Sequence, residues 1–162
     1  MIEDRRNKKD IFPSFSEPND NLINLLNKTS EIICQWFTET EKNGPLPTQD
    51  NFKCFLPDDH GSSSEDLLAD IEVLLSNSFN PVHPGSLAHL DPPPLIFSIL
   101  GDLIAASLNN NLLAYELSPS LTLLEETLCK WFTKKIGFSD CSGGIAASGG
   151  TLSNLNALIS AR

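Results

Sequence analysis

A run of small and hydroxyl-bearing residues at positions 143–154 has the composition of a turn that binds an anion. It reads GGIAASGGTLSN, so a short apolar stretch leads into two glycines and a threonine. Apolar residues then recur at helical spacing, at Leu155, Leu158 and Ile159. The first N–H groups of a helix have no intrahelical acceptor and carry about half a positive charge, which suits a phosphate. Gly149 and Gly150 let the backbone approach such a ligand closely, and the Thr151 hydroxyl adds a donor.

A simpler interpretation of this segment needs no ligand. Thr151 would then be the N-cap of the following helix, and the two glycines would form an ordinary tight turn. Motifs as short as Gly-Gly-Thr arise often by chance, so the motif alone favours this simpler interpretation.

Two histidines and an acid lie in a stretch rich in proline and glycine, residues 77–94. His83, His89 and Asp91 are residue types that bind metals, but five residues between two histidines is not a recognised ligand spacing. We therefore expect histidines that brace the loop or face solvent, and no metal site. The sequence contains no G-x-S-x-G motif and no cysteine near a histidine, so it offers no recognisable nucleophile with its base.

Charge and composition narrow the class of protein. The 162 residues carry 11 Lys and Arg against 21 Asp and Glu, a net charge of −10, which disfavours nucleic acid or an anionic membrane as the partner. No apolar run is long enough to span a bilayer, and the N-terminus does not resemble a secretory signal. The four cysteines, at 34, 54, 129 and 141, are scattered without a metal-site or disulfide pattern, so we expect reduced thiols in a cytoplasmic protein.

The elements that must position these residues are mostly helical. Spacing and terminal signals predict four helices before the turn. The first begins at Asn21 with Asp20 as N-cap and is ended by Gly44-Pro45, and the second runs from a capping box at Ser62 and Glu65 through Leu75. The third helix covers Leu95–Leu113, and the fourth runs from Ser118-Pro119 to a C-cap at Gly137. The helix predicted over Leu95–Leu113 is apolar on nearly every side, so it requires burial on all its faces. The apolar stretch before Gly149 predicts one strand. A parallel strand–turn–helix unit needs neighbouring strands, so the chain looks truncated.

Taken in series, these segments resemble the group II pyridoxal-phosphate-dependent amino acid decarboxylases, which include glutamate, aromatic amino acid and 2,4-diaminobutyrate decarboxylases. Order and spacing agree over about residues 64–162. The matching stretches are His83-Pro84, Ala88-His89-Leu90-Asp91-Pro92-Pro93-Pro94, Asp102, Asn109-Asn110-Asn111, Tyr115-Glu116-Leu117-Ser118-Pro119, Glu125, Trp131, Ser148-Gly149-Gly150-Thr151-Leu152-Ser153-Asn154 and Ala161-Arg162.

The resemblance implies an α/β enzyme of fold type I that binds pyridoxal 5′-phosphate. It implies a phosphate loop on Gly150 and Thr151, shaped by Gly149 and Ser148. It also implies a substrate pocket with positions contributed by six residues: His89, Leu90, Asp91, Pro92, Asn109 and Leu113. In such enzymes the N-terminal helices pack across the partner subunit of a homodimer, which agrees with the all-round apolar helix.

The resemblance also identifies what this chain lacks. In the family a lysine that follows a histidine forms a Schiff base with the coenzyme, and no lysine here follows a histidine. We therefore expect no catalytic residue in this chain, which by itself should be inactive. The expected organisation is a mobile tail at 1–20, a helical dimer-contact segment with the substrate loop at 21–95, and the incomplete beginning of the coenzyme-binding large domain at 96–162.

The implied activity is decarboxylation of a small-molecule L-amino acid to the amine and CO2. Two alternatives remain open: another fold type I enzyme of this coenzyme, a lyase or an aminotransferase, and a non-catalytic dimerisation fragment. Gly85-Ser86 stand where several relatives carry bulkier or aromatic groups, which weakens the case for an aromatic substrate.

Overall fold

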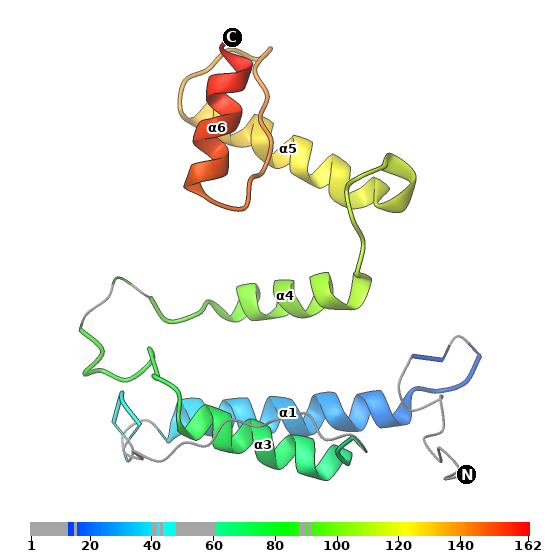
Figure 1. Ribbon diagram of the computed structural model, residues 1–162, viewed down its shortest axis with the longest axis vertical. Helices are drawn as coiled ribbons and strands as arrows, with labels where there is room; N and C mark the ends of the chain where they lie inside the picture. Colours follow the sequence, from blue (N-terminus) through cyan, green and yellow to red (C-terminus); the bar gives the residue numbers. More distant parts are fainter. Residues whose placement is uncertain are drawn as a thin grey trace. The chain divides into compact units, whose positions relative to one another are not determined.

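The computed structural model describes residues 13–14, 16–39, 42, 44–47, 61–87, 90 and 92–162. Its elements are α1 (Asp20–Thr38), α3 (Ser64–Ser76), α4 (Ile96–Leu108), the 3-10 turn η2 (Tyr115–Leu117), α5 (Pro119–Lys135) and α6 (Gly150–Ser160) (Figure 1). The chain divides into two compact units, Met1–Leu95 and Ile96–Arg162. In the described part of the chain, no helix is both long and apolar enough to cross a membrane. The predicted tail at 1–20 lies mostly outside the described residues.

Helix α1 packs along α3 in the first unit (Figure 1). The sequence predicts Asp20 as the N-cap, which is wrong by one residue: α1 begins at Asp20 and its cap position is Asn19. The Asn19 side chain makes no cap bond, because its Oδ1 accepts from the Ser14 N–H at 2.6 Å. The helix ends at Thr38, earlier than the end predicted at Gly44-Pro45.

Helix α3 begins with a capping box one residue later than predicted. The pair is Ser63 and Asp66 rather than Ser62 and Glu65. The Ser63 Oγ accepts from the Asp66 N–H at 3.0 Å, and the Asp66 carboxylate accepts from the Ser63 N–H at 3.2 Å and its hydroxyl at 2.7 Å. These hydrogen bonds satisfy two donors that the start of a helix leaves free.

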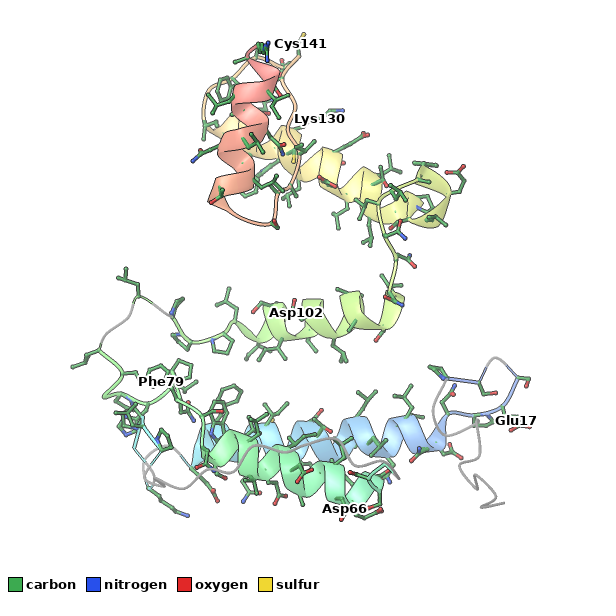
Figure 2. The ribbon with its side chains drawn as sticks, viewed as in Figure 1. Glu17, Asp66, Phe79, Asp102, Lys130 and Cys141 are labelled. Carbon is green, nitrogen blue, oxygen red and sulfur yellow. The ribbon has the colours of Figure 1, made fainter. Side chains whose placement is uncertain are left out.

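Helix α4 in the second unit is shorter than the predicted Leu95–Leu113. It ends at Leu108 because Asn109 adopts φ +45°, a left-handed conformation that stops a helix and that asparagine tolerates. All residues of α4 are exposed in the described structure, and its lone acid is Asp102 (Figure 2). The predicted all-round apolar character is therefore present without a covering partner among the described residues.

Helix α5 (Pro119–Lys135) has the predicted start, while its C-cap is Ile136, one residue before the predicted Gly137. Ser118 occupies the cap position and Pro119 the first turn, although the Ser118 side chain makes no cap bond. At the other end the Phe138 N–H donates to the Thr133 carbonyl at 3.0 Å and the Gly137 N–H to the Lys134 carbonyl at 3.2 Å. This Schellman arrangement requires a left-handed residue, and Gly137 supplies it at φ +88°.

The predicted strand before the glycine turn is absent. Residues 142–147 have no regular secondary structure, and no strand occurs among the described residues. A strand exists only through a ladder of hydrogen bonds to a neighbour, and the described residues provide no such neighbour. The segment lies instead against α5, through contacts described below.

Candidate functional site

The glycine turn leads directly into α6 and leaves its first donors free. Gly149 is the cap residue, in extended conformation at φ 167° and ψ 173°, with no side-chain cap bond. The first N–H bonded back to the turn is that of Ser153, which donates to the Gly149 carbonyl at 3.0 Å. The simpler sequence interpretation, with Thr151 as the N-cap, is therefore wrong: Thr151 is the second residue of the helix.

Three consecutive backbone donors open α6. The N–H groups of Gly150, Thr151 and Leu152 precede Ser153, the first residue bonded back to the cap, and no side chain caps them. A Cβ added at Gly149 or Gly150 would meet no atom within 4 Å, so both glycines border open space in the described structure. Free N–H groups beside open space, at the positive end of an 11-residue helix, suit an anion.

The segment before the turn is attached to α5 at two points. The Glu125 Oε1 accepts from the Ala146 N–H at 2.7 Å. Two residues earlier, a Cβ on Gly144 would lie 3.4 Å from the Cys129 Cβ and 3.6 Å from its Sγ, so the backbone runs close to that side chain. Sequence reasoning noted Glu125 only as a matching residue and gave it no role, because nothing local links it to a residue 21 positions away.

The lysines at the end of α5 form no comparable site. Lys134 lies 3.7 Å from the Asp140 carboxylate with both side chains largely exposed, and the Lys135 Nζ is 5.6 Å from the centre of the Trp131 ring. Exposed pairs of this kind contribute at most about 1 kcal/mol each. Water competes for these groups, so they do not define a specific anion site.

The predicted substrate residues are placed only in part. His89 and Asp91 lie outside the described residues. Leu90 and Pro92 are exposed, and Leu90 has φ +61°, a strained conformation for leucine that the sequence does not reveal. Among the described residues of the second unit, no hydrogen bond joins Asn109 or Leu113 to the glycine turn; both are exposed.

His83 braces the start of this loop. Its Nδ1 accepts from the Gly85 N–H at 2.8 Å, and its carbonyl accepts from the Ser86 N–H at 2.9 Å. A Cβ at Gly85 would lie 3.0 Å from that Nδ1, so the turn is tight at this glycine. No group of three potential metal ligands occurs in the described part of the chain.

Comparison with known proteins decides the family. The family model described as the pyridoxal-dependent decarboxylase conserved domain matches residues 51–162, more than half of the chain. This chain belongs to that family. The match contains α3 to α6 and the whole glycine turn. Pyridoxal 5′-phosphate is the coenzyme that the family implies.

Curated relatives of the family are amino acid decarboxylases. An L-2,4-diaminobutyrate decarboxylase of Acinetobacter baumannii is 35% identical over 92 residues, 57% of this chain and 18% of the relative. An L-aspartate decarboxylase of Metarhizium robertsii is 29% identical over 119 residues, 73% of this chain and 24% of the relative. An aromatic-L-amino-acid decarboxylase of Bacillus atrophaeus is 31% identical over 108 residues, which are 64% of this chain and 22% of the relative. The chain thus spans about a fifth of their length.

A solved structure shows the fold. The glutamate decarboxylase domain of a diaminobutyrate-pyruvate transaminase and L-2,4-diaminobutyrate decarboxylase from Vibrio parahaemolyticus has a TM-score of 0.84 and 24% identity. The match covers 96% of this chain and 35% of that one. The helices and connections described above therefore follow the fold of a decarboxylase domain of this coenzyme family.

The donor set of the α6 turn fits the phosphate of the coenzyme. Three free N–H groups, the exposed Thr151 hydroxyl and two glycines without neighbours are the groups that hold a phosphate at a helix start. The coenzyme also needs a lysine for its Schiff base. None of the eight lysines of this chain follows a histidine, and the expectation that none of them fills this role stays a prediction.

Proposed function

We propose that this chain is the N-terminal part of an enzyme that decarboxylates an L-amino acid to the corresponding amine and CO2, with pyridoxal 5′-phosphate as coenzyme. The observation that carries the proposal is the uncapped start of α6 in a chain of this family, with the N–H groups of Gly150, Thr151 and Leu152 free. Bound there, the coenzyme would supply an electron sink for the bond that loses CO2.

The role of this chain's residues is binding and orientation. The amides of Gly150 and Thr151 and the Thr151 hydroxyl would hold the phosphate, while Gly149 and Ser148 shape the approach of the backbone. A fixed phosphate fixes the coenzyme against the substrate, and correct orientation contributes directly to rate. His89, Leu90, Asp91, Pro92, Asn109 and Leu113 would contribute to the substrate pocket, and the Schiff-base lysine would come from sequence outside this chain.

The complete enzyme would be a homodimer in the cytoplasm. Support for the dimer comes from α4, whose apolar residues are all exposed: Ile96, Phe97, Ile99, Leu100, Leu103, Ile104 and Leu108. An exposed apolar surface of this kind is typical of a protein interface. Support for the compartment comes from the cysteines, since Cys34, Cys129 and Cys141 are free thiols.

Release of CO2 tests the proposed reaction. The full-length protein, loaded with the coenzyme, is given a panel of carboxyl-labelled L-amino acids. Decarboxylation predicts labelled CO2 and one equivalent of amine from at least one of them. A keto acid without CO2 would assign the protein to the aminotransferases instead. A discrete, stable dimer of the 162-residue chain with no turnover in any longer form would support the dimerisation fragment.

A further inference from the structure

The contact between Glu125 and Ala146 joins the middle of α5 to the segment that enters the glycine turn. The Glu125 Oε1 accepts from the Ala146 N–H at 2.7 Å, a short hydrogen bond across 21 residues. Bonds in which a carboxylate accepts from an N–H are about twice as strong as neutral ones. Glu125 is half-buried while Ala146 is exposed, so the side chain reaches from α5 to the outer segment.

A second contact sets the direction of this segment along the helix. Cys129 lies four residues after Glu125, on the same face of α5, and Gly144 lies two residues before Ala146. Gly144 lies beside Cys129 and Ala146 beside Glu125, so the segment runs antiparallel to α5 over this stretch.

The register of the segment determines where the turn begins. Ala146 is three residues before Gly149, the cap of α6, and among the described residues no other hydrogen bond joins the segment between them to α5. If Ala146 slipped along α5, the free N–H groups of Gly150 and Thr151 would move with it. An anion site made of backbone donors depends on such placement, because those donors have no side-chain freedom with which to compensate.

We propose that Glu125 is a positioning residue for the phosphate turn: its carboxylate holds Ala146 in register on α5 and so places the free N–H groups at the start of α6. The inference rests on the proposed function, since it assigns the turn to the coenzyme phosphate. Glu125 is not itself a ligand, because a carboxylate repels a phosphate. Its contribution is transmitted through the backbone.

Affinity for the coenzyme with and without its phosphate tests this role. The apo form of the full-length protein is titrated with pyridoxal 5′-phosphate and with pyridoxal, for the wild type, E125A, E125Q and the control E126A at the exposed neighbouring glutamate. Exchange of the Ala146 amide is followed in parallel by hydrogen–deuterium exchange. General destabilisation of the protein lowers the affinity for both ligands by the same factor. The ratio of the two affinities therefore changes only if the phosphate contact itself is affected.

The expected result is specific to the phosphate. E125A raises the dissociation constant for pyridoxal 5′-phosphate about tenfold, changes that for pyridoxal less than about twofold, and speeds exchange at Ala146. E125Q keeps an oxygen that accepts from Ala146 and stays within about threefold of the wild type. E126A matches the wild type in all readouts.

Several results would overturn the inference. These are an E125A variant that loses affinity for both ligands equally or for neither, an E125Q variant as weak as E125A, and unchanged exchange at Ala146. A wild-type protein that binds pyridoxal as tightly as its phosphate would instead refute the proposed function, and the inference would fall with it. In that case faster exchange at the Ala146 amide in E125A would still show that Glu125 holds this amide. Failure of the proposed function can therefore be distinguished from failure of the role proposed for Glu125.

Discussion

The Asn80 side chain donates to the Trp36 carbonyl at 3.1 Å, across 44 residues of sequence. Trp36 is in the last turn of α1, where carbonyls lack helical partners, so Asn80 satisfies one of them. The same side chain accepts from the Val82 N–H at 3.1 Å, and the Asn80 N–H donates to the Pro45 carbonyl at 2.9 Å. Asn80 is 4% exposed, and it fixes the beginning of the loop that leads to the predicted substrate residues.

Replacing Asn80 by Ala should open this loop locally. The substitution removes the donor to the Trp36 carbonyl and the acceptor of the Val82 N–H, two part-buried hydrogen bonds that each contribute about 0.5–1.5 kcal/mol. We expect amide exchange over residues 80–86 of the full-length protein to become about tenfold faster or more. N77A is the matched control, since the side-chain amide of Asn77 donates only to the Val73 carbonyl of the adjoining helix α3. Equal exchange in N80A and wild type would refute this role for Asn80.

The capping box of α3 predicts a dependence on pH. Hydrogen bonds from the Ser63 hydroxyl and then the Ser63 backbone N–H lower the pKa of the Asp66 carboxyl, and only weak desolvation opposes them. A carboxyl whose pKa is lower in the folded state stabilises that state above its ordinary value of about 3.9, and this stabilisation is lost as the pH falls through the folded-state pKa. Figure 2 labels Asp66 at the start of α3.

The variant D66N separates this effect from others. At pH 7 the amides in the first turns of α3 should exchange faster in D66N than in the wild type, because the neutral amide is a weaker acceptor for Ser63. The ratio of the two rates at equal pH should fall toward one as the pH drops through the lowered pKa of Asp66, because the protonated carboxyl is then also a weaker acceptor. A ratio that stays constant from pH 7 down to the lowest pH at which the protein remains folded would contradict the assignment.

Local chemistry predicted the start of α5 and came within one residue of its C-cap, but it could not fix the start of α3. Ser118-Pro119 and Gly137 act through their own backbone conformation, so the predicted start is confirmed. The C-cap is Ile136, and Gly137 is the left-handed residue that follows it. At α3 the sequence offers two serines, each three residues before an acid, so the pattern fits Ser62 and Ser63 equally well. The hydrogen bonds between Ser63 and Asp66 in the structure show that Ser63 is the N-cap.

Features that depend on distant residues were missed or misjudged. The strand predicted before Gly149 is absent because a strand requires hydrogen bonds to a neighbour, which local hydropathy does not report. The bond between Glu125 and Ala146 gave no local signal for the same reason. The turn that we propose for the phosphate could be predicted from the sequence because its donors come from consecutive residues. Its uncapped start agrees with that hypothesis, which stays a prediction.

The 162-residue chain expressed alone should aggregate or require a chaperone. In the described structure no apolar side chain is buried, and the α4 residues Ile96 and Phe97 remain 76% and 84% exposed. Light scattering coupled to size exclusion measures the outcome. L103E, which places a charge on α4, should increase the soluble fraction of the isolated chain. A wild-type chain that is a soluble monomer and melts cooperatively would contradict this expectation.

Replacing Thr151 by Ala should weaken retention of the coenzyme in the full-length protein. Loss of one hydrogen bond to a charged phosphate costs on the order of 1.5–3 kcal/mol, which corresponds to a dissociation constant about 10 to 150 times higher. T151S keeps a hydroxyl at the same position and serves as the control. An absorbance titration compares the three proteins, and unchanged affinity in T151A would exclude Thr151 as a phosphate ligand.

The central claim is that the free amides at the start of α6 bind the coenzyme phosphate, and hydrogen–deuterium exchange at residues 149–152 tests it most directly. The full-length apoprotein is measured alone, with pyridoxal and with pyridoxal 5′-phosphate. Our account predicts strong protection of the Gly150, Thr151 and Leu152 amides by pyridoxal 5′-phosphate and none by pyridoxal, because only the phosphate accepts from them. Exchange at these amides that is the same with both ligands would contradict it.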